Sequence, residues 1–589
     1  MATPQEECLM DRRCTGRVAL ALLGIAALAL LATGAGSGAG DQHKKGGTLK
    51  LISSGDVDTI DPGRVYYSFG WQMLAPVHRT LYGIPADSTT TVPDLAAAPP
   101  TVSKDGTTVT VRIKSGVRFS PPVNREVTAA DVKYAIERSF ASNVPNGYVY
   151  TYFTPLVGAP TNPPKTPRPI AGIQTDGKYT LVFKLKAPST TFVGALVMTN
   201  TAPVPKEYAA TFDSKTTSDY GFHQVASGPY MFEADSSGNV QGKGYTPGKK
   251  IRLVRNPNWS AKTDYRPAYV DAIEVQEGFT DTAVGVRQIL NGSADGAGDY
   301  TVLPSTVIKQ LSTNSANEDN FYTAPSGTSY VVLNTAKKPF DDVHVRRAVN
   351  YVLDKNAMRL VQGGPVAGAI ATHFVGPEFK GKGFEAAGGF EYDPFASPNH
   401  AGSVAKAKAE MRKAGYADGM YDGPPLTAIV ANPSPSPDQA KVMAASFEKI
   451  GIEVNLKLVS IDAMFTKFCV VPKNQPELCP SVAWIPDFKD PVTMLDPTFN
   501  GRNIVPANNV NMAQLDDPKI NAAMVRAKLI KSEPLRHAAW GRIDRMITEQ
   551  GAVIPWLWTN VPNVVSDRIV PAKMLWNVGA LDLASTSIE

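Results

Sequence analysis

Apolar and polar residues alternate in several short segments of the first half of the chain, as they do in strands with one buried face. A helix is predicted behind Thr128, because Thr128 and Asp131 have the spacing of a capping box and apolar residues recur on one helical face after them. The first half therefore combines many strands with few helices. The predicted strands are residues 47–52, 109–113, 178–185, 251–255 and 269–275.

The second half has a different pattern, in which strands and helices alternate. A strand at 426–430, a helix at 438–449 and a strand at 452–458 follow one another with short connections, which predicts a parallel βαβ crossover. Roughly 550 residues remain after an N-terminal targeting segment, more than one hydrophobic core usually supports, so two α/β lobes are expected. The other predicted elements are helices at 345–353, 403–414 and 534–549 and an apolar strand at 553–558.

The N-terminus has the order of a secretory signal peptide. Arg12, Arg13 and Arg17 precede an uncharged run at 18–32, and small residues follow at 33–38. The run is short for a membrane span, but an N-terminal transmembrane anchor is the alternative interpretation. The paired arginines also permit a twin-arginine export signal.

The end of the apolar run, Leu31-Ala-Thr-Gly34, is similar to the approach to a bacterial lipoprotein cleavage site. A lipid would be attached to a cysteine at the next position, where this chain has Ala35. Lipid anchoring at that position is therefore chemically impossible, and membrane tethering is in doubt.

Composition and motifs exclude several classes of function. The 589 residues are 43% hydrophobic and 19% charged, the net charge is only +5, and no basic stripe suggests nucleic-acid binding. The chain has no Gly-x-Ser-x-Gly, phosphate loop, His-Glu-x-x-His or Cys-x-x-Cys motif, and its seven histidines are scattered. No catalytic residue, metal site or cofactor is therefore expected.

Four cysteines occur, of which Cys8 and Cys14 would leave with the signal peptide. Cys469 and Cys479 remain, ten positions apart. In an oxidising exterior such a pair is expected to form a disulfide, and two unpaired thiols are the alternative. The bond would stiffen the approach to the segment that begins at Trp484.

That segment places two aromatic residues around a carboxylate. Trp484 and Phe488 flank Asp487, and the Asp490-Pro491 step marks a loop because proline cannot continue a helix or a sheet ladder. Such a loop suits a ligand that has both apolar surface and a positive charge. A surface loop with one buried tryptophan is the alternative. In an exported two-lobed chain without catalytic motifs, we expect the ligand to bind between the lobes.

Short motifs run in order through nearly the whole chain beyond the signal segment. They are residues 46–49, 58–62, 111–120, Val127-Thr-Ala-Ala-Asp-Val-Lys-Tyr-Ala-Ile-Glu-Arg138, 227–230, 255–259, 334, 339–348 and Ala483-Trp-Ile-Pro-Asp-Phe-Lys-Asp-Pro491. Together they resemble the extracytoplasmic solute-binding proteins of family 5, the peptide-, nickel- and oligosaccharide-binding components of ABC importers. One departure is the segment 121–126, which replaces the family's Asp-Gly before the capped helix and lengthens that turn.

The resemblance implies an α/β fold of the periplasmic-binding-protein type, a two-lobed clamshell of the large type II, cluster C form with mixed sheets and a hinge near Trp556 to Trp558. After a signal peptide and linker at 1–45, lobe I would cover 46–275 with an extra subdomain at about 92–170. Lobe II would cover 276–559, and residues 560–589 would return to lobe I.

The resemblance also implies a site. Asp487 occupies the position that pairs with the ligand's α-amino group in peptide-binding relatives, and Trp484 and Phe488 would stack on the ligand. Tyr66, Tyr67 and Trp71 would close from lobe I, although they are equally well explained as core aromatics.

The expected function is binding of a peptide-like small solute and its delivery to an ABC permease, by a monomer that is not an enzyme and does not bind nucleic acid. The expected location is the outer face of the cytoplasmic membrane, the periplasm or the exterior. A secreted sensor or scavenger without a permease and an exported hydrolase are the alternatives.

Overall fold

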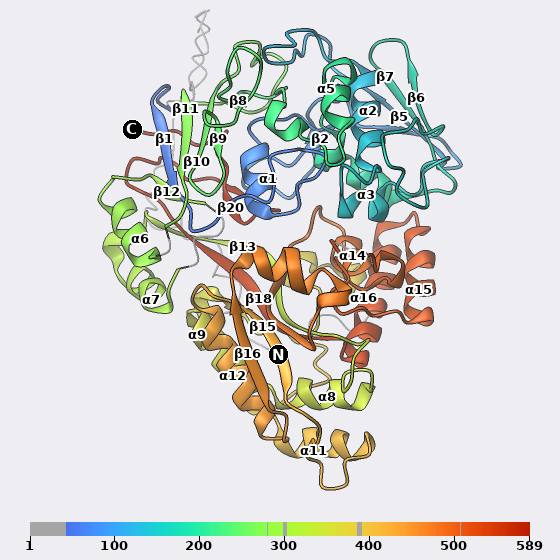
Figure 1. Ribbon diagram of the computed structural model, residues 1–589, viewed down its shortest axis with the longest axis vertical. Helices are drawn as coiled ribbons and strands as arrows, with labels where there is room; N and C mark the ends of the chain where they lie inside the picture. Colours follow the sequence, from blue (N-terminus) through green and yellow to red (C-terminus); the bar gives the residue numbers. More distant parts are fainter. Residues whose placement is uncertain (1–42, 280, 299–302, 386–390, 507) are drawn as a thin grey trace, which may run out of the picture. The chain divides into compact units, whose positions relative to one another are not determined.

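The computed structural model describes residues 43–589 apart from 280, 299–302, 386–390 and 507, and these residues form one compact unit. Most of the predicted signal segment, residues 1–42, lies outside the described residues. Two six-stranded sheets organise the unit, with helices packed around them (Figure 1). Within the described part of the chain, no helix combines the length and apolarity needed to cross a bilayer.

The first six-stranded sheet is built around β1, Thr48–Ile52, which pairs in parallel with β11, Ala272–Gln276. β10 pairs antiparallel with β11, so the sheet is mixed, as expected. Leu49 and Leu51 of β1 are buried in its core, which explains the alternating pattern of this strand. The remaining strands are β8 (Tyr230–Phe232), β9 (Tyr245–Thr246), β10 (Lys250–Arg255) and β12 (Gly296–Ala297).

A smaller antiparallel sheet with the order β4-β5-β7-β6 lies in the same half of the chain. The predicted helix is α2, Ala129–Ser139, and the Asp131 carboxylate accepts a hydrogen bond of 2.7 Å from the Thr128 backbone N–H, as a capping box requires. The strands are β4 (Thr101–Val102), β5 (Thr108–Arg112), β6 (Ile173–Asp176) and β7 (Thr180–Lys184), and the nearby helices are α1 (Ser68–Leu74), α3 (Gly147–Tyr152), α4 (Thr190–Gly194) and α5 (Lys206–Asp213).

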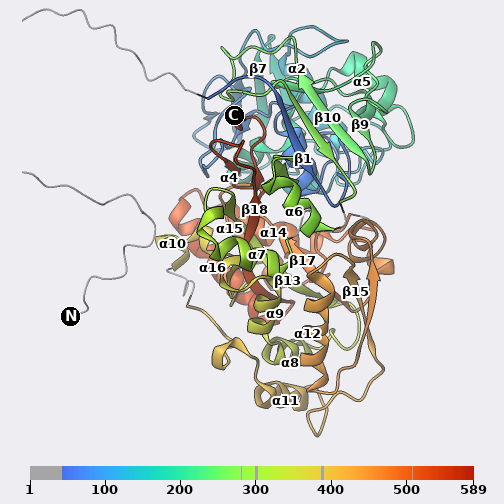
Figure 2. The same cartoon turned by 90° about the vertical axis from the view of Figure 1, so that its left-hand side faces the viewer.

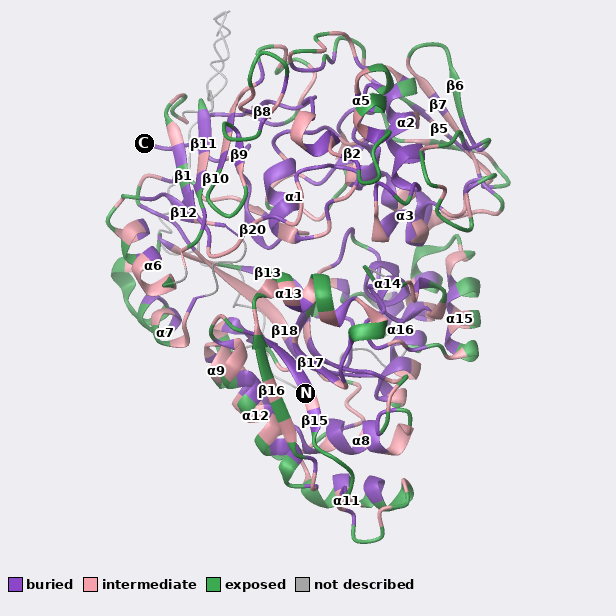
Figure 3. Ribbon diagram, viewed as in Figure 1, coloured by how far each residue is buried: buried purple, intermediate pink, exposed green. Residues whose placement is uncertain are grey.

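The second six-stranded sheet has the order β14-β18-β13-β17-β15-β16. Its β15 and β16 are parallel and joined through α12, so the predicted βαβ crossover is confirmed. β15 is mostly buried whereas β16 is an exposed edge strand, as Figure 3 shows. The strands are β13 (Phe321–Leu333), β14 (Gly368–Ala369), β15 (Leu426–Ala431), β16 (Val454–Val459), β17 (Leu478–Trp484) and β18 (Val553–Val564).

Helices accompany this sheet, and those predicted near 345, 403 and 534 are α8, α11 and α16. The 3.6-residue spacing of their apolar positions predicted them, because each packs one face on its neighbours. The helices are α8 (Val343–Val352), α9 (Lys355–Gln362), α11 (Val404–Lys413), α12 (Ser436–Glu448), α14 (Val492–Phe499), α15 (Pro518–Lys528) and α16 (Glu533–Gln550).

β13 and β18 form a long antiparallel ribbon, whose pairing runs from Phe321 opposite Val564 to Val332 opposite Val553. Just beyond β18, Val565 forms an isolated bridge with Gly296 of β12, in the first sheet. The ribbon therefore belongs to the second sheet and reaches the edge of the first, which Figures 1 and 2 show from two directions.

A buried ion cluster holds α2 in place. The Arg138 side chain is fully buried, and its guanidinium donates two hydrogen bonds to Asp61 (2.7 and 2.9 Å) and two to Asp213 (2.9 and 2.7 Å). The guanidinium carbon also lies 4.9 Å from the centre of the Tyr220 ring. These contacts tie α2 to a loop before α1 and to the end of α5.

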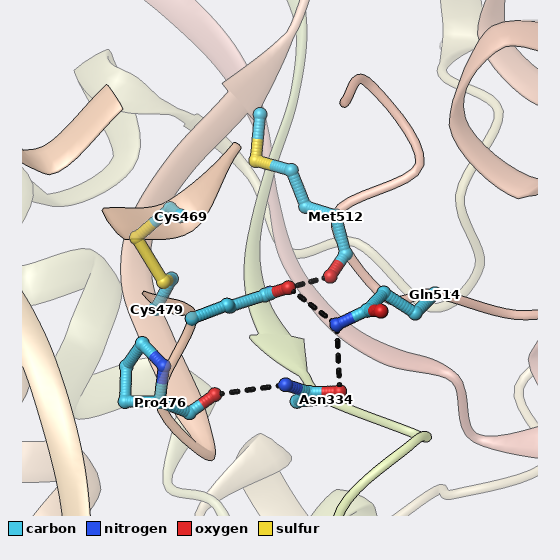
Figure 4. The surroundings of a disulfide bond; sticks show 7 residues. Asn334, Cys469, Pro476, Cys479, Met512 and Gln514 are labelled. Carbon is cyan, nitrogen blue, oxygen red and sulfur yellow. Dashed lines mark hydrogen bonds between the residues drawn. A yellow bond between two sulfur atoms is a disulfide. The ribbon is translucent and has the colours of Figure 1, made fainter. Parts of the chain in front are cut away.

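Cys469 and Cys479 are joined by a disulfide with an S–S distance of 2.05 Å (Figure 4). The bond connects a short helical segment, Met464–Cys469, to β17, and both cysteines are fully buried. The Gln514 amide donates hydrogen bonds to Asn334 (3.1 Å) and Gln475 (2.8 Å) beside it. The segment that leads into β17 is thus held by covalent and polar contacts.

Replacement of the buried arginine tests its structural role. Arg138→Met leaves two carboxylates buried without a counter-charge, so we expect the free energy of unfolding to fall by about 3–5 kcal/mol. Chemical denaturation measures the loss. Lys215→Met is the matched control, because Lys215 pairs with Asp219 at the surface and its removal should change the unfolding midpoint little. Equal losses in the two variants would contradict the structural role.

Removal of the disulfide should destabilise the protein because the unfolded chain gains freedom. For the double variant Cys469→Ala, Cys479→Ala we expect a loss of about 2–3 kcal/mol, the value for closing a loop of this length. Alkylation of the denatured wild-type protein should label these two cysteines only after reduction. Labelling of both without a reductant would show that the thiols are free.

Candidate functional site

A cavity of about 310 Å³ lies between elements from both halves of the chain. It is bounded by α1 and α3, by the end of β17, by α12 and by the ribbon of β13 and β18. Its lining residues are Tyr66, Tyr67, Ser68, Trp71, Tyr148, Ser329, Gln362, Ala431, Pro435, Ser436, Gln439, Ile461, Phe465, Ser481, Val482, Ala483, Trp484, Ile485, Asp487, Trp556, Thr559 and Asn577.

The loop after β17 is fixed by its own sequence. The Trp484 indole N–H donates to the Thr493 carbonyl oxygen at 2.7 Å. The Asp490 carboxylate accepts from the Val492 backbone N–H (3.0 Å) at the start of α14 and from the Arg536 guanidinium (2.9 Å). Asp490 is therefore a structural residue of the turn, and the contacts hold the intervening loop in one shape.

Asp487 is the central polar group of this loop. Its side chain is buried, and the Tyr152 hydroxyl donates a hydrogen bond to its Oδ2. No arginine, lysine or histidine forms an ion pair with it among the described residues. Because burial disfavours the charged form, the pKa of Asp487 rises to about 7, although the Tyr152 hydrogen bond lowers it.

Aromatic rings surround this carboxylate. The Tyr66 ring centre lies 5.8 Å from that of Tyr148 and 6.5 Å from that of Trp484, and Trp71 meets Tyr148 edge-on at 5.8 Å. Tyr148 in turn stacks on Tyr152, with ring centres 6.2 Å apart and planes within 7°. An apolar wall around one acid is suited to a cation that also has apolar surface.

The structure brings five of the six predicted ligand-contact residues to the cavity wall. Phe488 is the exception, because its ring packs 5.5 Å from the Tyr152 ring and fills the space above Gly194, where an added Cβ would lie 2.5 Å from it. Its position is behind the wall. The five residues that line the cavity are Tyr66, Tyr67, Trp71, Trp484 and Asp487.

Sequence reasoning missed several residues of the site. Tyr148 and Tyr152 lie four positions apart on one face of α3, a spacing that identifies them as neighbours but not as part of a site. Trp556 lies in an apolar strand that was expected to cross at a hinge and was not expected to contribute a side chain to the site. Trp71 Nε1 and Trp556 Nε1 are buried and have no hydrogen-bond partner among the described residues.

A close backbone contact places β17 against the ribbon. Gly327 of β13 has a φ of +66°, and a Cβ at this position would lie 1.9 Å from the Trp484 carbonyl oxygen. The pairing of β13 with β18 shifts register between Pro325 and Thr328, which marks a bulge here. Only glycine fits this contact.

Among the described residues, no three His, Cys, Asp or Glu side chains are grouped so as to hold a metal ion.

Known proteins similar to this chain are binding proteins by name. The chain is 25% identical to di/tripeptide-binding protein 2 of Pseudomonas aeruginosa over an alignment of 529 residues. This alignment covers 87% of this chain and 88% of the relative. Over 467 residues the chain is 22% identical to heme-binding protein A of Haemophilus influenzae, covering 77% and 76% of the two chains.

Solved structures show the same fold. Clavulanic acid biosynthesis oligopeptide binding protein 2 superposes with a TM-score of 0.77 at 26% identity, over 92% of this chain and 96% of that one. The periplasmic binding protein DppA from Helicobacter pylori, in complex with the peptide STSA, has a TM-score of 0.75 at 19% identity, over 93% and 99%. The expected two-lobed α/β fold is confirmed. The sequence model of the bacterial extracellular solute-binding proteins, family 5, matches residues 90–505, and the chain belongs to this family.

Proposed function

We propose that this protein binds a peptide-like solute through the solute's primary ammonium group and delivers it to an ABC permease. The observation that supports this most directly is Asp487, a buried carboxylate on the cavity wall that has one tyrosine hydroxyl and no ion-pair partner among the described residues.

The physical reason is the cost of burying a charge. An unpaired carboxylate in an apolar surrounding is unfavourable by several kcal/mol, and the raised pKa of Asp487 reflects this. A ligand ammonium supplies the missing counter-charge and a charge-assisted hydrogen bond, which is about twice as strong as a hydrogen bond between neutral groups. Trp484 and Tyr66 would contact the apolar part of the ligand.

The names of the relatives favour a peptide. A di/tripeptide-binding protein, oligopeptide-binding proteins and glutathione-binding proteins all match this chain over most of its length. A heme-binding protein matches as well, so membership of the family does not by itself determine the ligand. These relatives are binding proteins, and we therefore propose that the chain has no catalytic activity and that the exported hydrolase is the weaker alternative.

We further propose lobe I at 46–275, with an extra subdomain at about 92–170, lobe II at 276–559, and a return to lobe I at 560–589. The first sheet supports this division, because β1, β8, β9 and β10 lie in the first range and β11 extends one residue past it, to Gln276. β12 falls in the range of lobe II but pairs with β1. The ribbon of β13 and β18 would then act as the hinge.

In this arrangement the Tyr152 to Asp487 hydrogen bond joins the two lobes across 335 positions of sequence. Ligand binding would close the lobes around the cavity, as in other hinged binding proteins. Phe488 would support the wall from behind, through its contact with Tyr152.

The proposed location is outside the cytoplasm, with the protein acting as a monomer on a permease. Ala35 stands where a lipid-bearing cysteine would be needed, which favours the periplasm or the exterior over a lipid anchor at that position. The same residue supports a second candidate function, a secreted scavenger that works without a permease.

Neutralising the buried carboxylate tests the ammonium site. We expect Asp487→Asn to weaken binding of di- and tripeptides with a free N-terminus by about 100-fold, because a charge-assisted hydrogen bond of about 1.5–3 kcal/mol is lost. N-acetylated forms of the same peptides should bind the variant and the wild type almost equally. Isothermal titration calorimetry measures both.

Asp490→Asn is the matched control, since Asp490 lies in the same loop but pairs with Arg536. It should leave the preference for free over acetylated N-termini unchanged. Loss of this preference in Asp490→Asn, or its persistence in Asp487→Asn, would contradict the assignment of Asp487.

The pH dependence of binding should follow the titration of Asp487. Below its pKa of about 7 the carboxyl is protonated and must release its proton to pair with an ammonium. Affinity should therefore fall as the pH drops below 7, and fall again above about 8, where peptide amines lose their charge. At pH 6 binding should release close to one proton, measured by calorimetry in buffers of different ionisation enthalpy. The proton release should disappear in Asp487→Asn, and its persistence would show that another group titrates.

A further inference from the structure

We propose that the cavity selects solutes with a single positive charge, which have an ammonium at one end and uncharged hydrogen-bond acceptors, such as amide or ester carbonyls, at the other. The inference rests on the proposed function, because it takes the ammonium to be bound at Asp487. It adds that the remainder of the wall does not neutralise a ligand carboxylate.

The charges of the wall carry this inference. Among the described residues that line the cavity, Asp487 is the only one with a carboxylate, and no lysine, arginine or histidine lines it. The tyrosines stay neutral, because burial raises the pKa of Tyr66 and Tyr148 above its ordinary value and the nearby Asp487 carboxylate raises it further. The wall therefore has a net charge of −1 when Asp487 is ionised, which one ammonium balances.

The other polar groups of the wall are uncharged. Trp71 Nε1, Trp556 Nε1 and Ser481 Oγ are buried without a hydrogen-bond partner in the described structure. Trp556 is only 3% exposed, so water does not solvate its indole N–H. Indole N–H groups donate and do not accept. These groups carry no charge, so none of them could neutralise a ligand carboxylate.

Two of the three amide side chains of the wall, Gln362 and Gln439, are hydrogen-bonded to each other, and the third is Asn577. The Gln439 amide donates a hydrogen bond to the Gln362 carbonyl oxygen, and both residues line the cavity. A carboxylate placed in this part of the cavity would lose its water and gain no opposite charge. A carboxamide or an ester in the same place carries no charge and avoids this loss.

A neighbouring cavity contains an arginine that could bind a ligand carboxylate. A space of about 170 Å³ lies behind Tyr66, Tyr67 and Phe465, and it is lined by Arg64 and Asp58. Arg64 donates to the Ser218 carbonyl oxygen at 3.1 Å, and Asp58 accepts from the Tyr66 backbone N–H at 2.8 Å. The two side chains bring opposite charges, but burial raises the pKa of Asp58 to about 7, so near that pH the Arg64 charge is only partly balanced. A longer zwitterionic ligand would need to reach Arg64 to neutralise its carboxylate.

Matched ligands test the inference on the full-length protein. Leucyl-leucine, leucyl-leucinamide and leucyl-leucine methyl ester differ only at the C-terminal group, and alanyl-phenylalanine with its amide and ester forms a second series. Calorimetry at pH 7 should show the amide and the ester bound at least about tenfold more tightly than the free acid. Asp487→Asn should weaken all three forms.

A variant with an added charge gives the converse test. Gln362→Lys places an ammonium on the wall and should reduce the preference for the amide over the acid to near unity. Gln362→Met, which has a similar length and no charge, should keep the preference. The ratio of the two affinities is compared within each variant, so a general weakening of binding does not affect it.

Two outcomes would overturn the inference and leave the proposed function intact. In the first, acid and amide bind the wild type equally and both depend on Asp487. In the second, the acid binds more tightly and Arg64→Gln abolishes its advantage, which would place the carboxylate in the neighbouring cavity. Binding of all forms without dependence on Asp487 would instead contradict the proposed function, and this inference with it.

Discussion

The proposed binding site depends on one carboxylate that is kept away from water next to aromatic rings. Asp487 is 6% exposed, and in the described structure its polar contact is a single tyrosine hydroxyl. Such a group is stable only if its charge is neutralised, either by a proton or by a cation that enters the cavity. The loop between Trp484 and α14 is anchored by the Trp484 indole, and in the described structure it keeps the Asp487 side chain buried.

The scaffold around this group is built from separate, locally stable parts. Arg138 joins α2 to two acidic residues in the first half of the chain, and the Cys469 to Cys479 bond ties the segment before β17 to the strand that ends at the cavity. Arg138, Cys469 and Cys479 are not among the described residues that line the cavity. Each cluster fixes the backbone from which lining side chains project, so the position of the cavity walls follows from covalent and ionic contacts outside the cavity.

Local sequence patterns predicted most strands and helices of the fold. Each of these elements buries one face, and the spacing of apolar residues along the sequence identifies that face. β1, β5, α2 and the βαβ unit all follow this rule. The site was only partly predictable. Asp487 is identified by its motif, but Tyr152 reaches it from a helix that is 335 positions away, and no local pattern encodes that contact. In the loop, which has no period, the sequence does not tell which aromatic faces the cavity, and Phe488 proved to lie behind it.

Gly327, in the β13 bulge, limits which amino-acid substitutions are compatible with this fold. The Trp484 carbonyl oxygen occupies the space that a side chain at Gly327 would need, so the ribbon and the strand that forms part of the cavity wall meet in close backbone contact there. The residues that line the cavity and the residue that permits this backbone crossing are therefore different positions. Substitutions at Ser481 or Gln362 would alter which ligands the cavity binds. At Gly327, by contrast, the close backbone contact and the positive φ restrict the position to glycine in any homologous protein that keeps this contact.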